Sequence, residues 1–128
     1  MLDPSVQDLS RLPPLTPLSL AVLLALMDGD LHGYAILKEV ERQMEGRFKL
    51  GTGSLYAALQ RMRDEGLIED SPDELPTGAD SRRRYYRLTA YGREVARLET
   101  VRLARVLAVA REKRLVPDPG HELSPAKR

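Results

Sequence analysis

Apolar residues recur at helical spacing in several segments of the chain. Residues 16–27 are apolar on nearly all sides, which is typical of a helix at the centre of a core. Residues 33–44 and 51–66 each place an apolar stripe opposite a polar face, the pattern of a helix that covers a core from one side. A further helix is predicted from residue 90 to residue 115, between a cap at Thr89 and Pro117.

The spacing changes to a period of two between the third and the fourth of these helices. Residues 67–70 and 82–88 predict two antiparallel strands, with Tyr86 and Leu88 on the same face. Residues 71–81 between them are rich in Pro, Gly and Asp and too many for a tight turn, so a flexible flap is expected. The fold class is therefore mainly α with a small β-hairpin, in the order of a winged helix-turn-helix followed by a long C-terminal helix.

These elements divide the chain of 128 residues into a flexible N-terminal arm, one folded domain, a long helix and a disordered tail. The boundaries are expected at residues 1–14, 15–89, 90–116 and 117–128. The apolar stretch at residues 15–27 is short and interrupted by polar residues, which argues against a membrane span, and it lacks the basic leader and the cleavage site expected of a signal peptide. A cytoplasmic protein without a membrane partner is expected.

The third predicted helix has a polar face that is small and almost free of acid. Ser54, Ala57, Gln60 and Arg61 lie opposite the apolar stripe, and no carboxylate precedes Asp64. Such a face suits a helix that enters the DNA major groove, because bulky or anionic side chains would hold it away from bases and phosphates. Gln60 and Arg61 are candidates for contact with base edges or phosphates, and Arg61 is the preferred one. The alternative is an ordinary solvated helix surface.

The start of the same helix offers a second candidate contact. Thr52, Gly53 and Ser54 stand where free backbone N–H groups and the helix dipole favour a phosphate. An ordinary helix cap is the alternative reading, and both readings are compatible. Tyr56 lies at the border of the buried stripe, so its ring can pack while its hydroxyl reaches outward; packing in the core alone is its alternative.

Charge is distributed unevenly, although the formal net charge is only +1. Residues 1–81 carry 7 Lys or Arg against 14 Asp or Glu, whereas residues 82–128 carry 13 against 5. Basic residues gathered on one part of a fold are typical of a nucleic-acid contact, but a solvated, arginine-rich helix gives the same composition. Charge alone does not decide between the two.

The last predicted helix is longer than so small a core can cover. Its small apolar stripe runs along Ala96, Thr100, Leu103, Leu107 and Ala110, with Val106 beside it. Packing of the stripe on its own domain is one reading. Because the distal half would remain uncovered, pairing with a second copy of the chain is preferred, and a homodimer is expected.

Residues for other chemistry are few. The chain has no cysteine and therefore neither a disulfide framework nor a thiolate metal site. Its two histidines, His32 and His121, lie far apart in the sequence, and His32 is read as a helix-start residue. Since no nucleophile–base pair, carboxylate pair or phosphate loop is visible, no enzyme, catalytic residue, metal site or cofactor is predicted.

Three motifs, in a fixed order and spacing, carry a resemblance over about residues 15–95. They are HGYAILKEV at residues 32–40, GTGSLYAALQRMRDEGLIE at 51–69 and RRRYYRLTAYGR at 82–93. Together they resemble the PadR family of transcriptional regulators. The resemblance implies a winged-helix homodimer, usually a repressor, of the short branch in which a single C-terminal helix pairs with the partner subunit. Many members bind an effector at or near that interface, so a small-molecule effector of unknown identity is a further expected partner.

The resemblance also bears on two tyrosines and on the wing. Tyr34 matches a tyrosine that family members often place near the DNA backbone; its alternative is packing between the second and third helices. For Tyr56, the resemblance favours contact with DNA. The chain departs from the family at Ala57, where many members carry proline, and in an acidic flap. Because the flap carboxylates suit phosphate poorly, backbone contact is left to the base of the wing. The flap acids are Asp73, Glu74 and Asp80, and the arginines at the base are Arg82, Arg83 and Arg84.

Two functions from different classes remain. The leading hypothesis is a sequence-specific DNA-binding repressor that acts as a homodimer on a two-fold symmetric operator in double-stranded DNA. The alternative is a winged-helix adaptor that docks an acidic protein surface through its arginine-rich half. Selection from a random duplex pool separates them, because only the first returns a two-fold symmetric motif.

Overall fold

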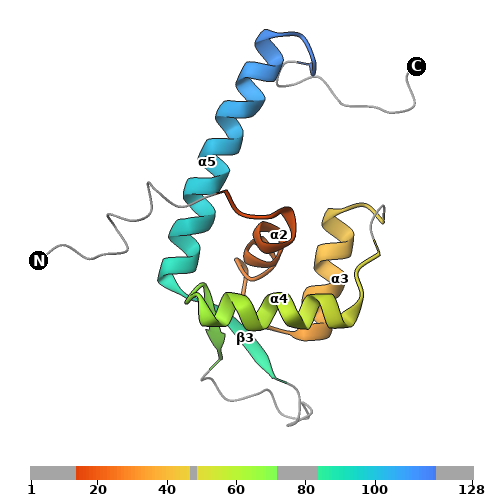
Figure 1. The fold of residues 1–128 in the computed structure, drawn as a ribbon, viewed down its shortest axis with the longest axis vertical. Coiled ribbons are helices and arrows are strands. Elements are labelled where there is room, and N and C mark those ends of the chain that lie inside the picture. Colours follow the sequence, from red (N-terminus) through yellow and green to blue (C-terminus); the bar gives the residue numbers. More distant parts are fainter. Residues whose placement is uncertain (1–13, 47–48, 72–83, 118–128) are drawn as a thin grey trace, which may run out of the picture.

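The computed structural model describes residues 14–46, 49–71 and 84–117 (Figure 1). Its helices are α2 (Pro17–Ala25), α3 (Gly33–Gln43), α4 (Thr52–Asp64) and α5 (Ala90–Glu112), and its strands are β1 (Leu31–His32), β2 (Ile68–Asp70) and β3 (Tyr85–Leu88). The predicted fold class, a mainly helical winged helix-turn-helix with a long C-terminal helix, is confirmed. Nearly all of the predicted arm, flap and tail lies outside the described residues.

Side chains cap three of the helices at their starts. Thr16 Oγ1 and Thr89 Oγ1 each accept a hydrogen bond from the backbone N–H three residues later, at 3.0 and 2.8 Å, and the cap at Thr89 is the predicted one. His32 does the same through Nδ1 at 3.2 Å, which confirms its reading as a helix-start residue. The first and last helices are shorter than predicted, because α2 ends at Ala25 and α5 at Glu112.

A small antiparallel sheet lies beside the helices. The strand order is β1-β3-β2, so the predicted hairpin of β2 and β3 gains a third strand at one edge. β1 pairs Leu31 with Tyr86, and β2 pairs Ile68 with Leu88. Tyr86 is buried at 4% exposure, in agreement with the predicted inward face of β3. Two residues are too few to show a period, which is why the pattern did not predict β1.

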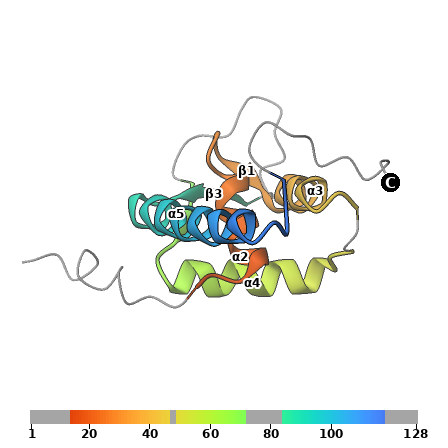
Figure 2. The same cartoon turned by 90° about the horizontal axis from the view of Figure 1, so that it is seen from above.

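The core forms where α2 meets α3, α4 and α5 (Figure 2). Figure 2 shows α2 between α5 on one side and α4 on the other. The largest fully buried side chains include Leu23, Ile36, Leu55, Leu59, Met62 and Ile68. Their burial holds α4 against the rest of the domain by its apolar stripe and leaves the opposite face of α4 to the surface.

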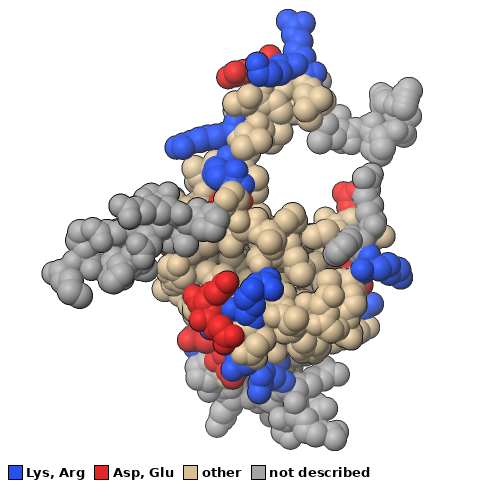
Figure 3. All heavy atoms as spheres, viewed as in Figure 1, with Lys and Arg blue, Asp and Glu red and all other residues tan. Residues whose placement is uncertain are grey.

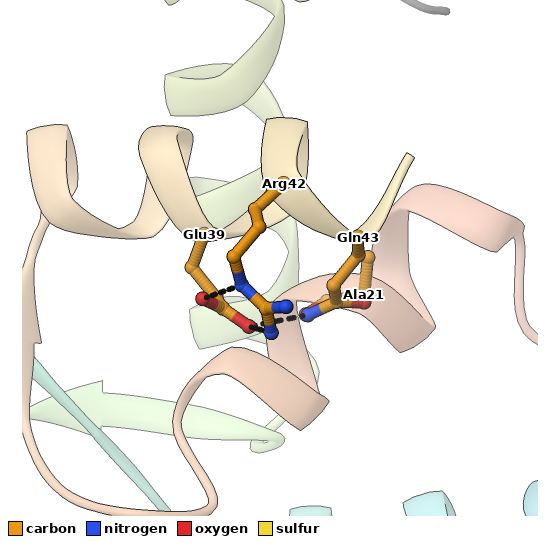
Figure 4. Close-up of polar contacts among 4 residues, drawn as sticks. All are labelled: Ala21, Glu39, Arg42 and Gln43. Carbon is orange, nitrogen blue, oxygen red and sulfur yellow. Dashed lines mark hydrogen bonds and ion pairs between the residues drawn. The ribbon is translucent and has the colours of Figure 1, made fainter. Parts of the chain in front are cut away.

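Polar contacts fix the C-terminal end of α3 on α2. Gln43 Nε2 donates to the backbone oxygen of Ala21 at 3.1 Å, and Arg42 donates to both carboxylate oxygens of Glu39 at 2.9 and 2.6 Å (Figure 4). These hydrogen bonds with Arg42 lower the pKa of the Glu39 carboxyl. Of these contacts, the one from Gln43 crosses between helices and ties the C-terminal end of α3 to α2.

Candidate nucleic-acid interface

The outward face of α4 is exposed, and its N-terminal half is uncharged. The predicted stripe of Leu55, Ala58, Leu59 and Met62 is buried, with each residue at most 1% exposed. Figure 3 shows α4 from its outward side: its N-terminal half carries no charged side chain, whereas acidic and basic side chains gather over its C-terminal half. The exposed residues of the uncharged part are Thr52, Gly53, Ser54, Tyr56, Ala57 and Gln60.

The start of α4 has free backbone donors. Gly51 occupies the N-cap position, no side chain makes a cap hydrogen bond there, and the first turn contains no acidic residue. The first helical hydrogen bond runs from Leu55 N to Gly51 O at 3.0 Å, so the N–H groups of Thr52, Gly53 and Ser54 precede it. The structure thus brings these three predicted residues together at an uncapped, exposed helix start, which suits an anion.

Tyr56 lies against the beginning of α3. Its side chain is 48% exposed, yet its hydroxyl end rests on Gly33, where a Cβ would overlap the hydroxyl oxygen and lie 2.6 Å from Cζ. The sequence predicts that this hydroxyl reaches outward. In the structure it packs on the backbone of α3 instead. This contact also explains the glycine in the second-helix motif, because a larger residue would displace the tyrosine ring.

Tyr34 lies on the surface of α3. The residue is 57% exposed, and the ammonium group of Lys38 lies 5.2 Å from its ring centroid. Packing between α3 and α4, the alternative reading of Tyr34, is not what the structure shows. An aromatic ring with an adjacent cation at this position is available to a phosphate backbone.

Gln60, and not Arg61, lies nearer the middle of the outward face. The Gln60 amide donates through Nε2 to Asp64 Oδ1 at 3.1 Å and accepts through Oε1 from Arg63 Nη1 at 3.2 Å. Arg61 lies on the flank that faces α2, with Nη2 3.4 Å from Ser19 Oγ. There it lines a cavity of about 620 Å³ between α2, α4 and α5. Both side chains are exposed, and Gln60 points more directly away from the buried stripe than Arg61 does.

The base of the wing carries an exposed arginine. Arg84 has 56% of its side chain exposed, and its Nε lies 3.8 Å from Asp70 Oδ1 at the end of β2. Burial raises the pKa of the neighbouring Tyr86 hydroxyl, and the positive charge of Arg84 opposes that shift. Arg82 and Arg83 lie outside the described residues, as do the flap acids.

Sequence reasoning missed Arg63 and Asp70. Arg63 Nη2 lies 3.3 Å from Asp70 Oδ2, and Nη1 of the same guanidinium donates to Gln60. The spacing of three residues between Gln60 and Arg63 was a usable signal, because such pairs meet on a helix surface. Asp70 gave no signal, since its position beside α4 depends on the turn into β2.

The predicted stripe on α5 divides into two parts. Ala96, at 3% exposure, belongs to the core of its own domain, so the alternative reading holds for this residue. Leu103, Val106 and Leu107 are 38%, 53% and 39% exposed. Thr100 is also exposed, and Ala110 is half-buried. Figure 1 shows this distal half of α5 extending beyond the rest of the described domain.

The described residues contain neither a helix that could cross a membrane nor a cluster of metal-binding side chains. Across 14–46, 49–71 and 84–117, no helix combines the length and the apolar character that crossing a bilayer requires. The same residues contain no group of three or more His, Cys, Asp or Glu side chains placed to hold a metal ion.

A helix-turn-helix of α3 and α4, with an exposed outward face on α4 and a small antiparallel sheet beside it, defines a winged-helix protein. The chain belongs to the PadR-like family of transcriptional regulators, whose family model matches residues 22–98. The resemblance found in the three motifs is thereby confirmed.

One sequence relative and two solved structures are similar to this chain. An uncharacterized 37.1 kDa protein in transposon Tn4556 of Streptomyces fradiae is 42% identical over 85 residues, which are 66% of this chain but only 22% of that protein. A PadR family transcription regulator from Clostridium difficile is 26% identical, with a TM-score of 0.63 over 76% of this chain and 97% of that one. Bacillus subtilis PadR, solved in complex with operator DNA, is 19% identical and shares the fold, with a TM-score of 0.52 over 85% of this chain and 52% of that one.

Proposed function

We propose that this protein is a sequence-specific DNA-binding repressor that binds a two-fold symmetric operator as a homodimer. The observation that carries the proposal is the outward face of α4, which is exposed, uncharged over its N-terminal half and uncapped at its start. A helix with these properties can approach both base edges and phosphates closely. The complex of Bacillus subtilis PadR with operator DNA supports the proposal at the level of the fold.

The residues of α4 take two roles in this proposal. The backbone N–H groups of Thr52, Gly53 and Ser54 bind a phosphate and set the depth of the helix in the groove. Gln60 reads a base edge, because an exposed amide offers both a donor and an acceptor. The acids Asp64 and Glu65 at the other end of α4 are repelled by phosphates, so the N-terminal half enters the groove more deeply.

Residues around α4 contact the DNA backbone. Tyr34 on α3 and Arg84 at the base of the wing are both exposed and flank α4 on different elements. Arg82 and Arg83 are assigned the same role from the sequence alone. Tyr56 contributes through the exposed part of its ring while its hydroxyl packs on Gly33.

Dimerisation completes the proposal. The exposed apolar residues on the distal half of α5 pair with a second copy, and the two-fold axis between them repeats the α4 face on the partner subunit. Two such helices enter successive major grooves about 34 Å apart, or a multiple of that distance. The bound dimer represses transcription by keeping other proteins off the operator. By analogy with the family, we also propose that a small effector releases the dimer from the DNA. A cytoplasmic location follows from this role.

The base of the wing provides one test of the interface. Arg84→Ala is expected to weaken binding to all duplexes alike and to lower the slope of log affinity against log salt by about one, because one phosphate contact is lost. Filter-binding titrations at several salt concentrations measure both quantities. Arg97→Ala on α5 is the control, since Arg97 pairs with Glu94 away from this face. An unchanged slope in Arg84→Ala would show that Arg84 is merely solvated.

Gln60→Ala tests the reading of bases. We expect it to reduce discrimination at one base pair of each half-site by about 1–3 kcal/mol while leaving the free energy of unfolding nearly unchanged, because the side chain is exposed. The measurement is a binding titration on the selected operator and on its single-position variants, beside a thermal melt. An equal loss of affinity for every duplex would mean that Gln60 contacts the DNA backbone. Unchanged affinity would mean that Gln60 lies outside the interface.

A further inference from the structure

A chain of polar contacts joins the outward face of α4 to the base of the wing. Asp64 accepts from Gln60, and Gln60 accepts from Arg63. Arg63 also donates through Nη2 to Asp70 at 3.3 Å, and Asp70 in turn lies 3.8 Å from Arg84 Nε. The chain thus crosses from α4 to the end of β2 and on to the residue before β3.

These contacts fix which way the Gln60 amide points. A guanidinium can only donate hydrogen bonds and a carboxylate can only accept them. The amide oxygen must therefore face Arg63, and the amide nitrogen must face Asp64. One N–H and one oxygen lone pair of the amide remain free, and together they form the donor–acceptor pair that matches the major-groove edge of adenine.

The guanidinium of Arg63 suits this role because it has two separate donor nitrogens. Nη1 contacts Gln60 and Nη2 contacts Asp70, so one planar group is held on both sides. Only 27% of the Arg63 side chain is exposed, against 48% for Asp70. A lysine would keep the charge but has a single nitrogen, which cannot hold this bridge as a rigid fork.

We propose that Arg63 is a specificity-determining positioning residue: by bridging Gln60 and Asp70 it fixes the orientation of the amide that reads the operator. This inference rests on the proposed function, since it assigns a role within DNA recognition. Asp70 contributes by anchoring Arg63 from β2. The base preference of α4 therefore depends on a residue that itself touches no base.

Arg63→Lys tests the inference in the full-length protein. We expect the preference at the base pair that depends on Gln60 to fall by roughly three- to tenfold, because the amide is then held by Asp64 alone and is less firmly oriented. Affinity for unrelated duplex DNA and the salt slope stay unchanged, because the charge is kept. Arg42→Lys is the matched control: it removes a similar two-pronged contact, that of Arg42 with Glu39 on α3, and should leave the base preference as it is.

Two further variants separate positioning from other roles. In a Gln60→Ala background, Arg63→Lys should change the base preference no further, because the positioned group is gone. Asp70→Asn should reproduce the loss of preference without any change in α4, whereas Glu69→Gln, the same loss of charge one residue earlier on β2, should not. Thermal melts confirm that each variant is folded at the assay temperature.

The outcomes are distinct. A preference profile of Arg63→Lys that matches the wild type would overturn the inference. So would a loss of preference that persists undiminished in the Gln60→Ala background, because Arg63 would then read a base itself. Wild-type protein that binds duplex DNA without any base preference would instead overturn the proposed function, and the inference with it.

Discussion

Leu103→Glu combined with Leu107→Glu is expected to give a monomer whose operator affinity is at least a hundredfold weaker than that of the wild type. Both leucines lie on the distal half of α5 and are 38% and 39% exposed. In the proposed dimer, the two-fold axis would bring four carboxylates into one apolar interface, where unpaired charge is strongly unfavourable. Each monomer would then hold only one half-site, without the gain from a second linked contact.

Sedimentation at micromolar concentration, beside an operator titration, measures this result. Arg105→Glu is the control, because it changes the net charge by the same amount as the double variant and lies on the opposite side of α5 from the two leucines. The control should remain a dimer. A wild-type protein that sediments as a monomer at this concentration would contradict the assignment of the α5 surface.

Gly92→Ala is expected to lower the free energy of unfolding by about 3 kcal/mol, the upper end of the usual cost of overpacking. A Cβ at Gly92 would overlap the backbone oxygen of Leu67 and lie 2.9 Å from its carbonyl carbon. That oxygen cannot easily move away, because it also accepts from Thr89 N and Thr89 Oγ1 at 3.2 and 3.0 Å. To relieve the overlap, the start of α5 would have to move away from Leu67, in the turn that leads into β2.

Urea denaturation at one fixed protein concentration measures the change, since a dimer adds a concentration term. Gly53→Ala is the matched control: it is the same substitution in the first turn of α4, where a Cβ meets nothing within 4 Å. Alanine there should leave stability unchanged or raise it slightly. A loss below about 0.5 kcal/mol in Gly92→Ala would mean that the two segments are not held this closely.

The fold could be predicted because its signals are local. Thr16 and Thr89 cap the helices they precede, and the stripe from Leu55 to Met62 is buried as its spacing required. β1 could not be predicted, since two residues carry no period and their strand pairing depends on β3, far along the chain. The spacing of apolar residues identifies the buried face of an element. It does not identify which distant element packs or pairs with that face.

The candidate site was predictable only in part, for the same reason. The helical spacing placed Gln60 and Arg61 together on a polar face, but the position of Arg61 beside Ser19 depends on how α2 crosses α4. The hydroxyl of Tyr56 rests on Gly33, which the sequence separates from it by more than twenty residues. The bridge from Arg63 to Asp70 likewise requires the turn into β2. Which distant residue a side chain meets depends on how the elements pack in three dimensions, and the local sequence does not show this.

Selection of duplexes from a random pool by the full-length protein tests the central claim most directly. We expect a two-fold symmetric motif whose half-sites lie about 34 Å apart, or a multiple of that distance, because paired α4 helices would read successive major grooves. Gln60→Ala should relax one position in each half-site of that motif. A pool that shows no enriched motif, although the protein retains it at low salt, would contradict the account and favour an adaptor that binds acidic surfaces through charge alone.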